Sequence, residues 1–126
     1  MNAVIEVAGR LLVAQIFVLA GFSKVSGYEG TQAYMQAMGV PVGLLPMVIL
    51  LELGGGLAFA AGFLTRPLAA ALAVFSVIAA VIFHGNSADQ MQMIMFMKNI
   101  AMAGGLLMWI RHGSDKFSVD AFLKNR

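Results

Sequence analysis

The sequence predicts an all-α integral membrane protein, a four-helix bundle with its N- and C-termini on the cytoplasmic side. Of its 126 residues, 60% are hydrophobic and 11% are charged, and the mean hydropathy is +0.87. A typical soluble domain has roughly 25% charged residues. Four long apolar stretches also follow one another along the chain, and together they leave little sequence for anything else.

A helix needs about 20 mostly apolar residues to cross a bilayer, with a range of roughly 17–25. Four stretches meet this requirement, at about residues 4–22, 44–64, 67–83 and 93–110. Backbone N–H and C=O groups in lipid must be paired within their own segment, so helices are the expected form. With a short cytoplasmic tail at 111–126, the spans make one domain over residues 1–126. The first span has the length of a signal peptide, but Glu6 and Arg10 predict that it is retained.

The connections between the spans are short except for the first. Thr65-Arg66-Pro67 forces the second and third spans into an antiparallel hairpin, and Pro67 suits the first position of a helix. In the longer connection, residues 23–43, Thr31 can cap a short helix that Gly39 and Pro41 end. This helix would lie at the membrane surface; an irregular loop is the alternative.

The distribution of Lys and Arg outside the spans predicts the orientation. Basic residues gather on the side of the second hairpin turn and of the tail, and Lys24 lies on the other side. The gathered residues are Arg66, Arg111, Lys116, Lys124 and Arg126. We therefore expect a multi-pass protein of the inner (plasma) membrane, with both ends in the cytoplasm.

Five polar residues fall at similar depth within three of the spans: Glu52, Lys98, Asn99, Arg10 and Gln15. Glu52 lies roughly 3 Å and Lys98 about 5 Å from the midpoints of their spans, at about 1.5 Å per residue. A charge at the bilayer centre costs about 2.5–3.5 kcal/mol, so these groups should face one another inside the bundle. Glu52 paired with Lys98 or Arg10 would fix the helix register, or Glu52 would bind a proton, a cation or a quinone head group.

Small residues around Glu52 are typical of tightly packed membrane helices. Gly54, Ala58 and Gly62 recur every four residues, and Gly55 and Gly56 clear space beside Glu52. The third span has its own small residues, Ala69, Ala73, Ser76 and Ala80, and the fourth has Ala101, Gly104 and Gly105.

Metal sites and self-contained catalysis have little support. Met93 and Met97 share a helix face and could bind Cu(I), a soft ion, but packing is the more ordinary role of methionine. His84, near Asp89, could serve in proton entry or as a single ligand, and it lies across the membrane from His112. No cysteine, phosphate-binding loop or HExxH run is present. We expect no enzyme activity from this chain alone and no nucleic-acid binding.

Several short motifs resemble the DoxX family of small bacterial and archaeal membrane proteins. They are "GFSK" (21–24), "MGVP" (38–41), "LELGGG" (51–56), "GFLTR" (62–66), "FMKNIAMAGGLL" (96–107) and "GSDKFSVDAFL" (113–123). The resemblance implies a four-helix membrane bundle. It also implies association with redox systems, since the family is named for a subunit of an archaeal thiosulfate:quinone oxidoreductase.

Three hypotheses for function follow. The first is an accessory membrane subunit of a redox system, with a partner protein and with quinone as the candidate cofactor. The second is a small transporter of protons or solutes, which would need a homo-oligomer because four short helices enclose little volume. The third is a structural membrane protein without chemistry.

Overall fold

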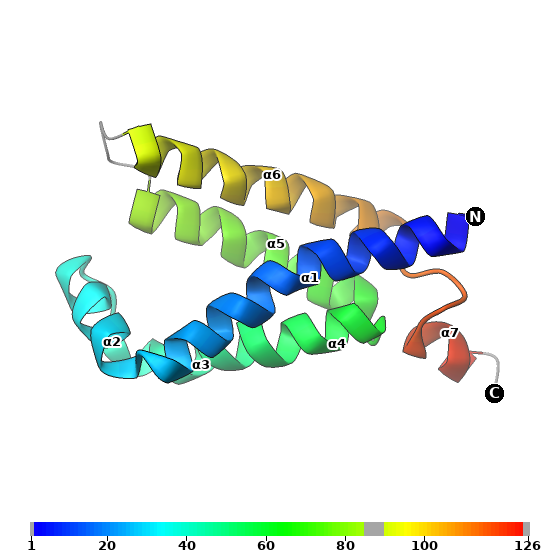
Figure 1. The fold of residues 1–126 in the computed structure, drawn as a ribbon, viewed down its shortest axis with the longest axis horizontal. Coiled ribbons are helices and arrows are strands. Elements are labelled where there is room, and N and C mark those ends of the chain that lie inside the picture. Colours follow the sequence, from blue (N-terminus) through cyan, green and yellow to red (C-terminus); the bar gives the residue numbers. More distant parts are fainter. Residues whose placement is uncertain (1, 85–89, 125–126) are drawn as a thin grey trace.

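The computed structural model describes residues 2–84 and 90–124, and it is helical almost throughout (Figure 1). The elements are α1 (Asn2–Ser26), α2 (Tyr28–Ala37), the 3₁₀ turn η1 (Val42–Leu44), α3 (Leu45–Ile49), η2 (Leu50–Gly55), α4 (Gly56–Ala61), α5 (Thr65–Ala79), η3 (Ala80–His84), α6 (Gln90–His112) and α7 (Val119–Lys124). Both η2 and η3 are π-helical. Four continuous helical stretches are long and apolar enough to cross a membrane: Asn2–Ser26, Val42–Ala61, Thr65–Phe83 and Gln90–His112. The predicted all-α fold with four spans is confirmed.

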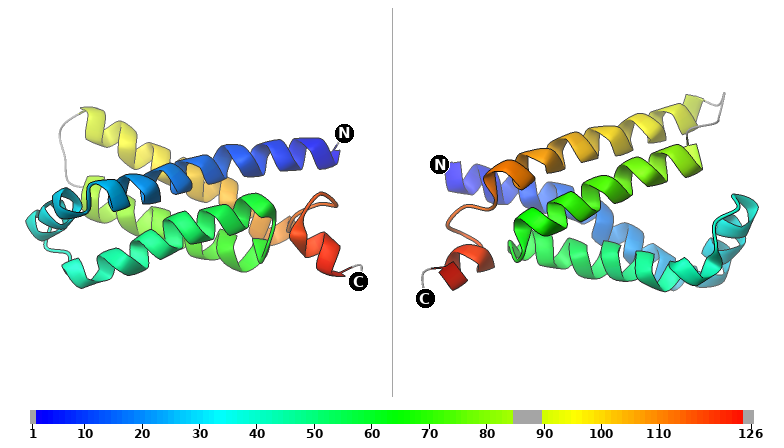
Figure 2. Two further views of the ribbon diagram at one scale, coloured as in Figure 1. Left: turned by 60° about the horizontal axis from the view of Figure 1, so that its bottom comes forward. Right: turned by 180° about the vertical axis from the view of Figure 1, so that it is seen from behind.

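The four long helices pack as two antiparallel pairs (Figures 1 and 2). One pair is α5 with α6, and the other is α1 with the continuous helix of α3, η2 and α4. The two chain ends lie at the same end of the bundle (Figure 1). The core between the pairs is centred on large, fully buried side chains: Phe17, Phe59, Leu72 and Leu106. Many other large apolar side chains are exposed, as expected of helices that face lipid.

Two glycines bring α1 and the second span into close contact. A methyl group added to Gly21 would lie 2.7 Å from the backbone N of Leu53, and one added to Gly56 would lie 3.0 Å from Val18 Cγ2. Several of the glycines that the sequence pattern singled out for helix packing make no such contact. Gly54 and Gly55 meet only side chains at ordinary contact distances, and Gly104 and Gly105 have nothing within 4 Å of an added methyl group. Close packing of α1 on the second span therefore depends on Gly21, which the sequence pattern missed, and on Gly56. Gly62, which the pattern included, is also tightly packed, against Ser118 and the Arg10 guanidinium.

The connection after α1 contains the predicted short helix, but it begins before Thr31. α2 starts at Tyr28, and the Thr31 hydroxyl donates a 3.0 Å hydrogen bond to the Gly27 carbonyl in the preceding turn. A side chain that bonds back one turn sits inside a helix, not at its cap. The end of the helix is as expected: Gly39 adopts φ +75, and Pro41 prevents continuation.

The C-terminal segment folds back onto the bundle, although the sequence suggested only a short tail. Asp120 accepts hydrogen bonds from the backbone N–H groups of Leu64 (2.8 Å) and Thr65 (2.9 Å), at the start of α5. Leu64 has φ 51, an uncommon conformation for a residue with a side chain, and this contact helps to hold it. Burial works to raise the pKa of Asp120, but hydrogen bonds from Thr65, Leu64 and Ser114 outweigh it and lower that pKa below its ordinary value.

Candidate functional site

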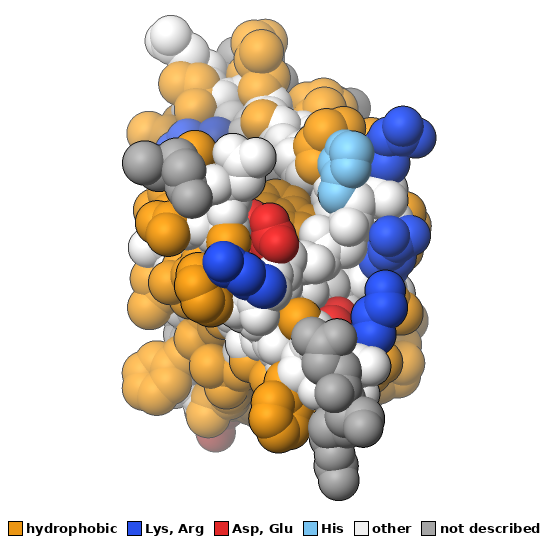
Figure 3. All heavy atoms as spheres, turned by 90° about the vertical axis from the view of Figure 1, so that its right-hand side faces the viewer, with side chains coloured by type: hydrophobic (Ala, Val, Ile, Leu, Met, Phe, Trp, Pro, Cys, Tyr) orange, Lys and Arg blue, Asp and Glu red, His pale blue; other side chains and the backbone are white. Residues whose placement is uncertain are grey.

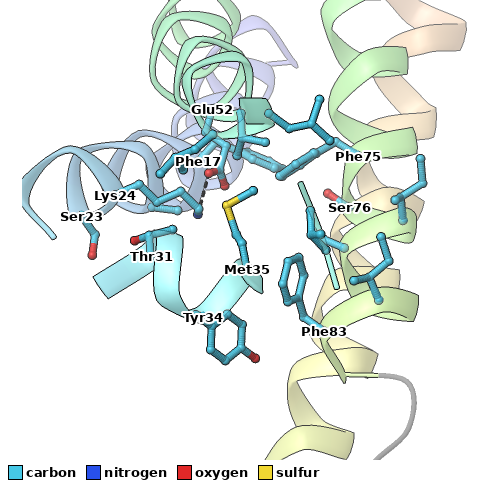
Figure 4. Close-up of a pocket in the computed structure, with 18 of the residues that line it drawn as sticks. Phe17, Ser23, Lys24, Thr31, Tyr34, Met35, Glu52, Phe75, Ser76 and Phe83 are labelled. Carbon is cyan, nitrogen blue, oxygen red and sulfur yellow. Dashed lines mark ion pairs between the residues drawn. The ribbon is translucent and has the colours of Figure 1, made fainter. Parts of the chain in front are cut away.

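A cavity of about 760 Å³ is shown in close-up in Figure 4. One of the helices that line it, α2, lies at the end of the bundle away from the chain termini (Figure 1). The cavity wall comes from α1, α2, α3, η2, α5, η3 and α6, so every span contributes to it. Most of the lining is apolar and includes Phe17, Phe75 and Phe83. Gly30 of α2 and Ile78 and Ile82 on the opposite side are exposed at the rim. The cavity therefore opens between α2 and the end of the third span.

Glu52 lies in the wall of this cavity and is only 4% exposed. Its carboxylate forms an ion pair with Lys24, with 2.6 Å between Oε1 and Nζ (dashed in Figure 4). Among the described residues, Lys24 is the one charged or hydrogen-bonding group that reaches the carboxylate. A buried charge that keeps a single partner is costly to hold in a protein interior.

Glu52 lies in η2, a π-helical segment whose backbone hydrogen bonds join residues five apart instead of the four of an α-helix. Such segments are rare and frequently occur at functional sites. The second π-helical segment, η3, carries Ile82 and Phe83 into the same cavity. Both described π-helical segments within the spans therefore line one site.

Lys24 stands in the last turn of α1, where the helix dipole favours a cation. Its side chain is 28% exposed and points toward Glu52 beside Thr31 (Figure 4). The structure thus differs from the predicted pairing of Glu52 with Lys98 or Arg10. Lys24 follows the predicted first span in the sequence, so it was expected outside the membrane. The estimated depth of each residue along its span could not show that the end of α1 packs beside the middle of the second span. The "GFSK" motif is the signal that could have singled it out.

Arg10 belongs to a separate polar cluster at the end of the bundle that holds the termini. It is 2% exposed and pairs with Glu6 at 2.6 Å. It also donates hydrogen bonds to the carbonyls of Ala60 (3.0 Å) and Phe117 (2.7 Å). Glu6 in turn accepts a 2.7 Å hydrogen bond from the indole N–H of Trp109. This cluster joins four segments of the chain and lines no part of the cavity.

The remaining predicted polar residues lie apart from one another. Asn99 is half-buried and lines the cavity, and its amide has no hydrogen-bond partner among the described residues. Gln15 and Lys98 are exposed on the outside of the bundle. Of the five residues grouped by depth, the structure therefore brings two, Glu52 and Asn99, to the cavity. Depth alone cannot tell which side of a helix faces inward.

The short helix α2 covers one side of the cavity. Met35 is 4% exposed and points toward the ion pair, and the ring of Tyr34 stacks on Phe83 with centroids 5.4 Å apart (Figure 4). Met38 is the exposed C-cap of this helix, because α2 ends at Ala37.

No group of three His, Cys, Asp or Glu side chains that could hold a metal ion occurs in residues 2–84 and 90–124. Met93 and Met97 are exposed and do not line the cavity, so Cu(I) binding there stays a prediction. Asp89 and the side chain of His84 lie outside the described residues. His112 ends α6 at the end of the bundle opposite η3 (Figure 1).

Comparison with known proteins identifies the family of this chain. The model of the DoxX family matches residues 5–85. The chain belongs to the DoxX family. The inner membrane protein YqjF of Escherichia coli strain K12 is 47% identical over 117 residues, which cover 93% of this chain and 90% of YqjF. The inner membrane protein YphA of the same strain is 33% identical over 124 residues, covering 93% of this chain and 89% of YphA. No solved structure matches.

This DoxX-family protein is therefore a multi-pass inner membrane protein. The matched region includes Lys24 and Glu52 and every cavity element except α6. A wide apolar space with one ion pair and one free amide suits a molecule that is mostly apolar and has a small hydrogen-bonding head.

Proposed function

We propose that this protein binds a lipid-soluble molecule in the cavity, with a quinone as the first candidate, as an accessory membrane subunit of a quinone-linked redox system. The observation that carries the proposal is the Lys24–Glu52 ion pair in the wall of an apolar cavity of about 760 Å³. Ligand pockets for small molecules typically measure about 300–1,000 Å³ and combine apolar walls with few polar groups.

The polar groups suit a head group that accepts hydrogen bonds. The Lys24 ammonium has three N–H donors, and its ion pair with Glu52 at 2.6 Å leaves other donors available. Asn99 on α6 offers a second donor from another wall. A quinone ring carries two carbonyl oxygens, each of which accepts hydrogen bonds. Its isoprenoid tail would leave past the exposed rim residues Ile78 and Ile82 into lipid.

The distribution of charge suggests how the cavity is oriented in the membrane. The end of the bundle opposite the cavity shows a group of Lys and Arg side chains along one edge (Figure 3). The exposed basic residues at this end are Arg66, Arg111, Lys116 and Lys124. Under the positive-inside rule this end faces the cytoplasm, and the cavity then opens toward the outer leaflet.

Transport of protons or solutes is less well supported by the geometry. Phe17, Phe59 and Leu72 are fully buried and fill the bundle between Glu52 and the Arg10 cluster. No chain of polar side chains joins the two polar sites within the described residues. Proton flux into liposomes that depends on Glu52 would nevertheless replace the present proposal with this one.

The test is ligand binding to the full chain purified in mild detergent. Mass spectrometry of an organic extract should detect a bound quinone, and a short-chain quinone should bind on titration. Ala79→Trp places a large side chain into the cavity wall, and we expect it to weaken binding about tenfold or more. Ala71→Trp on the exposed side of the same helix is the matched control and should bind as the wild type does. Equal binding by both variants would refute the proposal.

A double variant tests the role of the ion pair in binding. Lys24→Met combined with Glu52→Met removes both charges together, so neither is left buried without a partner. We expect a folded protein whose quinone affinity has fallen. A quinone that binds this double variant as tightly as the wild type would show that the ion pair plays no part in recognition.

A further inference from the structure

Lys98 is a charged side chain on the outer surface of a membrane helix, with no partner in the described part of the chain. It stands on α6, three residues before the midpoint of Gln90–His112, and it is exposed. No ion pair or hydrogen bond reaches it from any described residue. At about 1.5 Å per residue it lies about 10 Å inside the boundary of a hydrocarbon core about 30 Å thick.

A lysine at this depth is costly when it faces acyl chains, and such residues almost always face a protein interior or a paired group. Lysines near helix ends can extend their ammonium to the interface, but Lys98 is a poor candidate because it lies near the middle of its helix. Its environment in the single chain is therefore incomplete.

We infer that the exposed side of α6 around Lys98 docks a transmembrane helix of a different membrane protein, and that this helix carries an Asp or Glu at the depth of Lys98. Charge complementarity indicates the chemistry of the partner, because a carboxylate would neutralise the ammonium and accept its hydrogen bonds. The inference does not depend on what the cavity binds.

The shape of this surface permits such a contact. α6 lies at the edge of the bundle and packs mainly against α5 (Figures 1 and 2). Ala101 and Gly104 are exposed near Lys98, and a methyl group added to Gly104 or Gly105 would meet nothing within 4 Å. Small residues let a neighbouring backbone approach closely, and the unpaired charge of Lys98 then selects which helix does so.

A second copy of this chain fits the surface poorly. A two-fold axis normal to the membrane would place Lys98 at the same depth as Lys98 of the other copy, and like charges repel. α6 contains no Asp or Glu, and Glu52, the described acid near mid-depth, is buried with Lys24. A ring in which Lys98 met Gln15 of the next copy would leave the ammonium charge unneutralised.

The test is site-specific photocross-linking of the full chain in native membranes. A photoreactive amino acid replaces Ala101, and a second variant carries it at Val74, which is 58% exposed on α5, as the control for non-specific contact. We expect Ala101, and not Val74, to capture a membrane protein whose cross-linked helix has an acid at matching depth. Lys98→Met should lower the yield about tenfold or more.

Charge exchange decides whether the captured contact is the inferred one. Lys98→Glu should abolish the cross-link, and replacement of the partner's acid by Lys should restore it. A cross-link to a second copy, capture of a helix without an acid, no capture at Ala101, or a yield unchanged by Lys98→Met would each overturn the inference. Thermal stability of purified Lys98→Met should match the wild type, which separates loss of docking from loss of folding.

Discussion

The Lys24–Glu52 ion pair predicts an asymmetric pattern of stability in single and double variants. Lys24→Met leaves Glu52, which is 4% exposed, without its partner, and this should destabilise the protein by about 3–5 kcal/mol. Glu52→Met leaves Lys24 instead, and its side chain is 28% exposed and can regain some solvation. We expect a smaller loss of about 1–3 kcal/mol.

The double variant should be much less destabilised than the two single variants together. Replacing both partners of a buried pair by apolar side chains is often neutral or stabilising. Because the two single losses sum to about 4–8 kcal/mol and the double variant is expected to be near neutral, the double-mutant cycle should give a coupling energy of about 4 kcal/mol or more, above the roughly 0.5–3 kcal/mol usual for residues in contact. Lys116→Met, on the exposed tail, is the control and should change stability by no more than about 0.5 kcal/mol.

Denaturant unfolding in mild detergent, followed by the fluorescence of Trp109, measures these differences. Trp109 is the one tryptophan of the chain, and its indole N–H bonds to Glu6 in the other polar cluster, so its signal reports unfolding of the bundle rather than local change at the cavity. Additive effects of Lys24→Met and Glu52→Met would refute a buried ion pair.

Three further predictions concern packing and the end of the bundle that holds the termini. Gly21→Ala should destabilise the protein by about 1–3 kcal/mol because the new methyl group lies 2.7 Å from a backbone nitrogen. Gly105→Ala in the purified chain is the control and should be neutral or slightly stabilising. Equal effects of the two substitutions in the same unfolding assay would contradict the packing described. Arg10→Met should destabilise the protein by about 3–5 kcal/mol because Glu6 loses its buried partner. A protease should also cut the C-terminal segment of this variant faster, because the hydrogen bond from Arg10 to the Phe117 carbonyl is lost. An unchanged rate of digestion would argue against that contact. The lowered pKa of Asp120 stabilises the fold above its unfolded pKa of about 3.9, and this contribution is lost as pH falls through the folded value. Asp120→Asn should therefore make the free energy of unfolding fall less steeply as the pH is lowered. An unchanged pH dependence on the acid side would count against the cap on α5.

The spans and their order could be predicted from the sequence because length and hydropathy alone decide whether a helix can cross a bilayer. The observed spans differ from the predicted ones by a few residues at most of their ends, for example Gln90–His112 against 93–110. Helix ends depend on capping and fraying, and hydropathy does not report either.

The partners of the polar residues could not be predicted, because depth along a span says nothing about rotation around it. Lys98 and Glu52 lie at comparable depth, yet Lys98 is exposed and Glu52 is buried. The π-helical segment at Glu52 adds a further rotation that a regular period of 3.6 residues does not anticipate. Lys24 reaches the site only because Gly21 lets α1 pack closely on Leu53, a contact between residues far apart in sequence.

The two polar sites use similar groups and satisfy them differently, which bears on whether Glu52 is structural or functional. At the end of the bundle near the termini, Arg10 has three acceptors, and its partner Glu6 has further donors from Trp109 and from the backbone of Asp115. Such a saturated network specifies a structure and leaves no group to bind anything else. In the cavity, Glu52 has only Lys24 among the described residues, and the space there is wide enough to admit a ligand. Buried polar groups with so few partners call for an explanation, and a ligand head group that completes their hydrogen bonds supplies one. If the cavity were only a packing defect, the double Met variant would be stabler than the wild type and equally active in the cell; loss of cellular function in that stable variant would assign the pair to recognition.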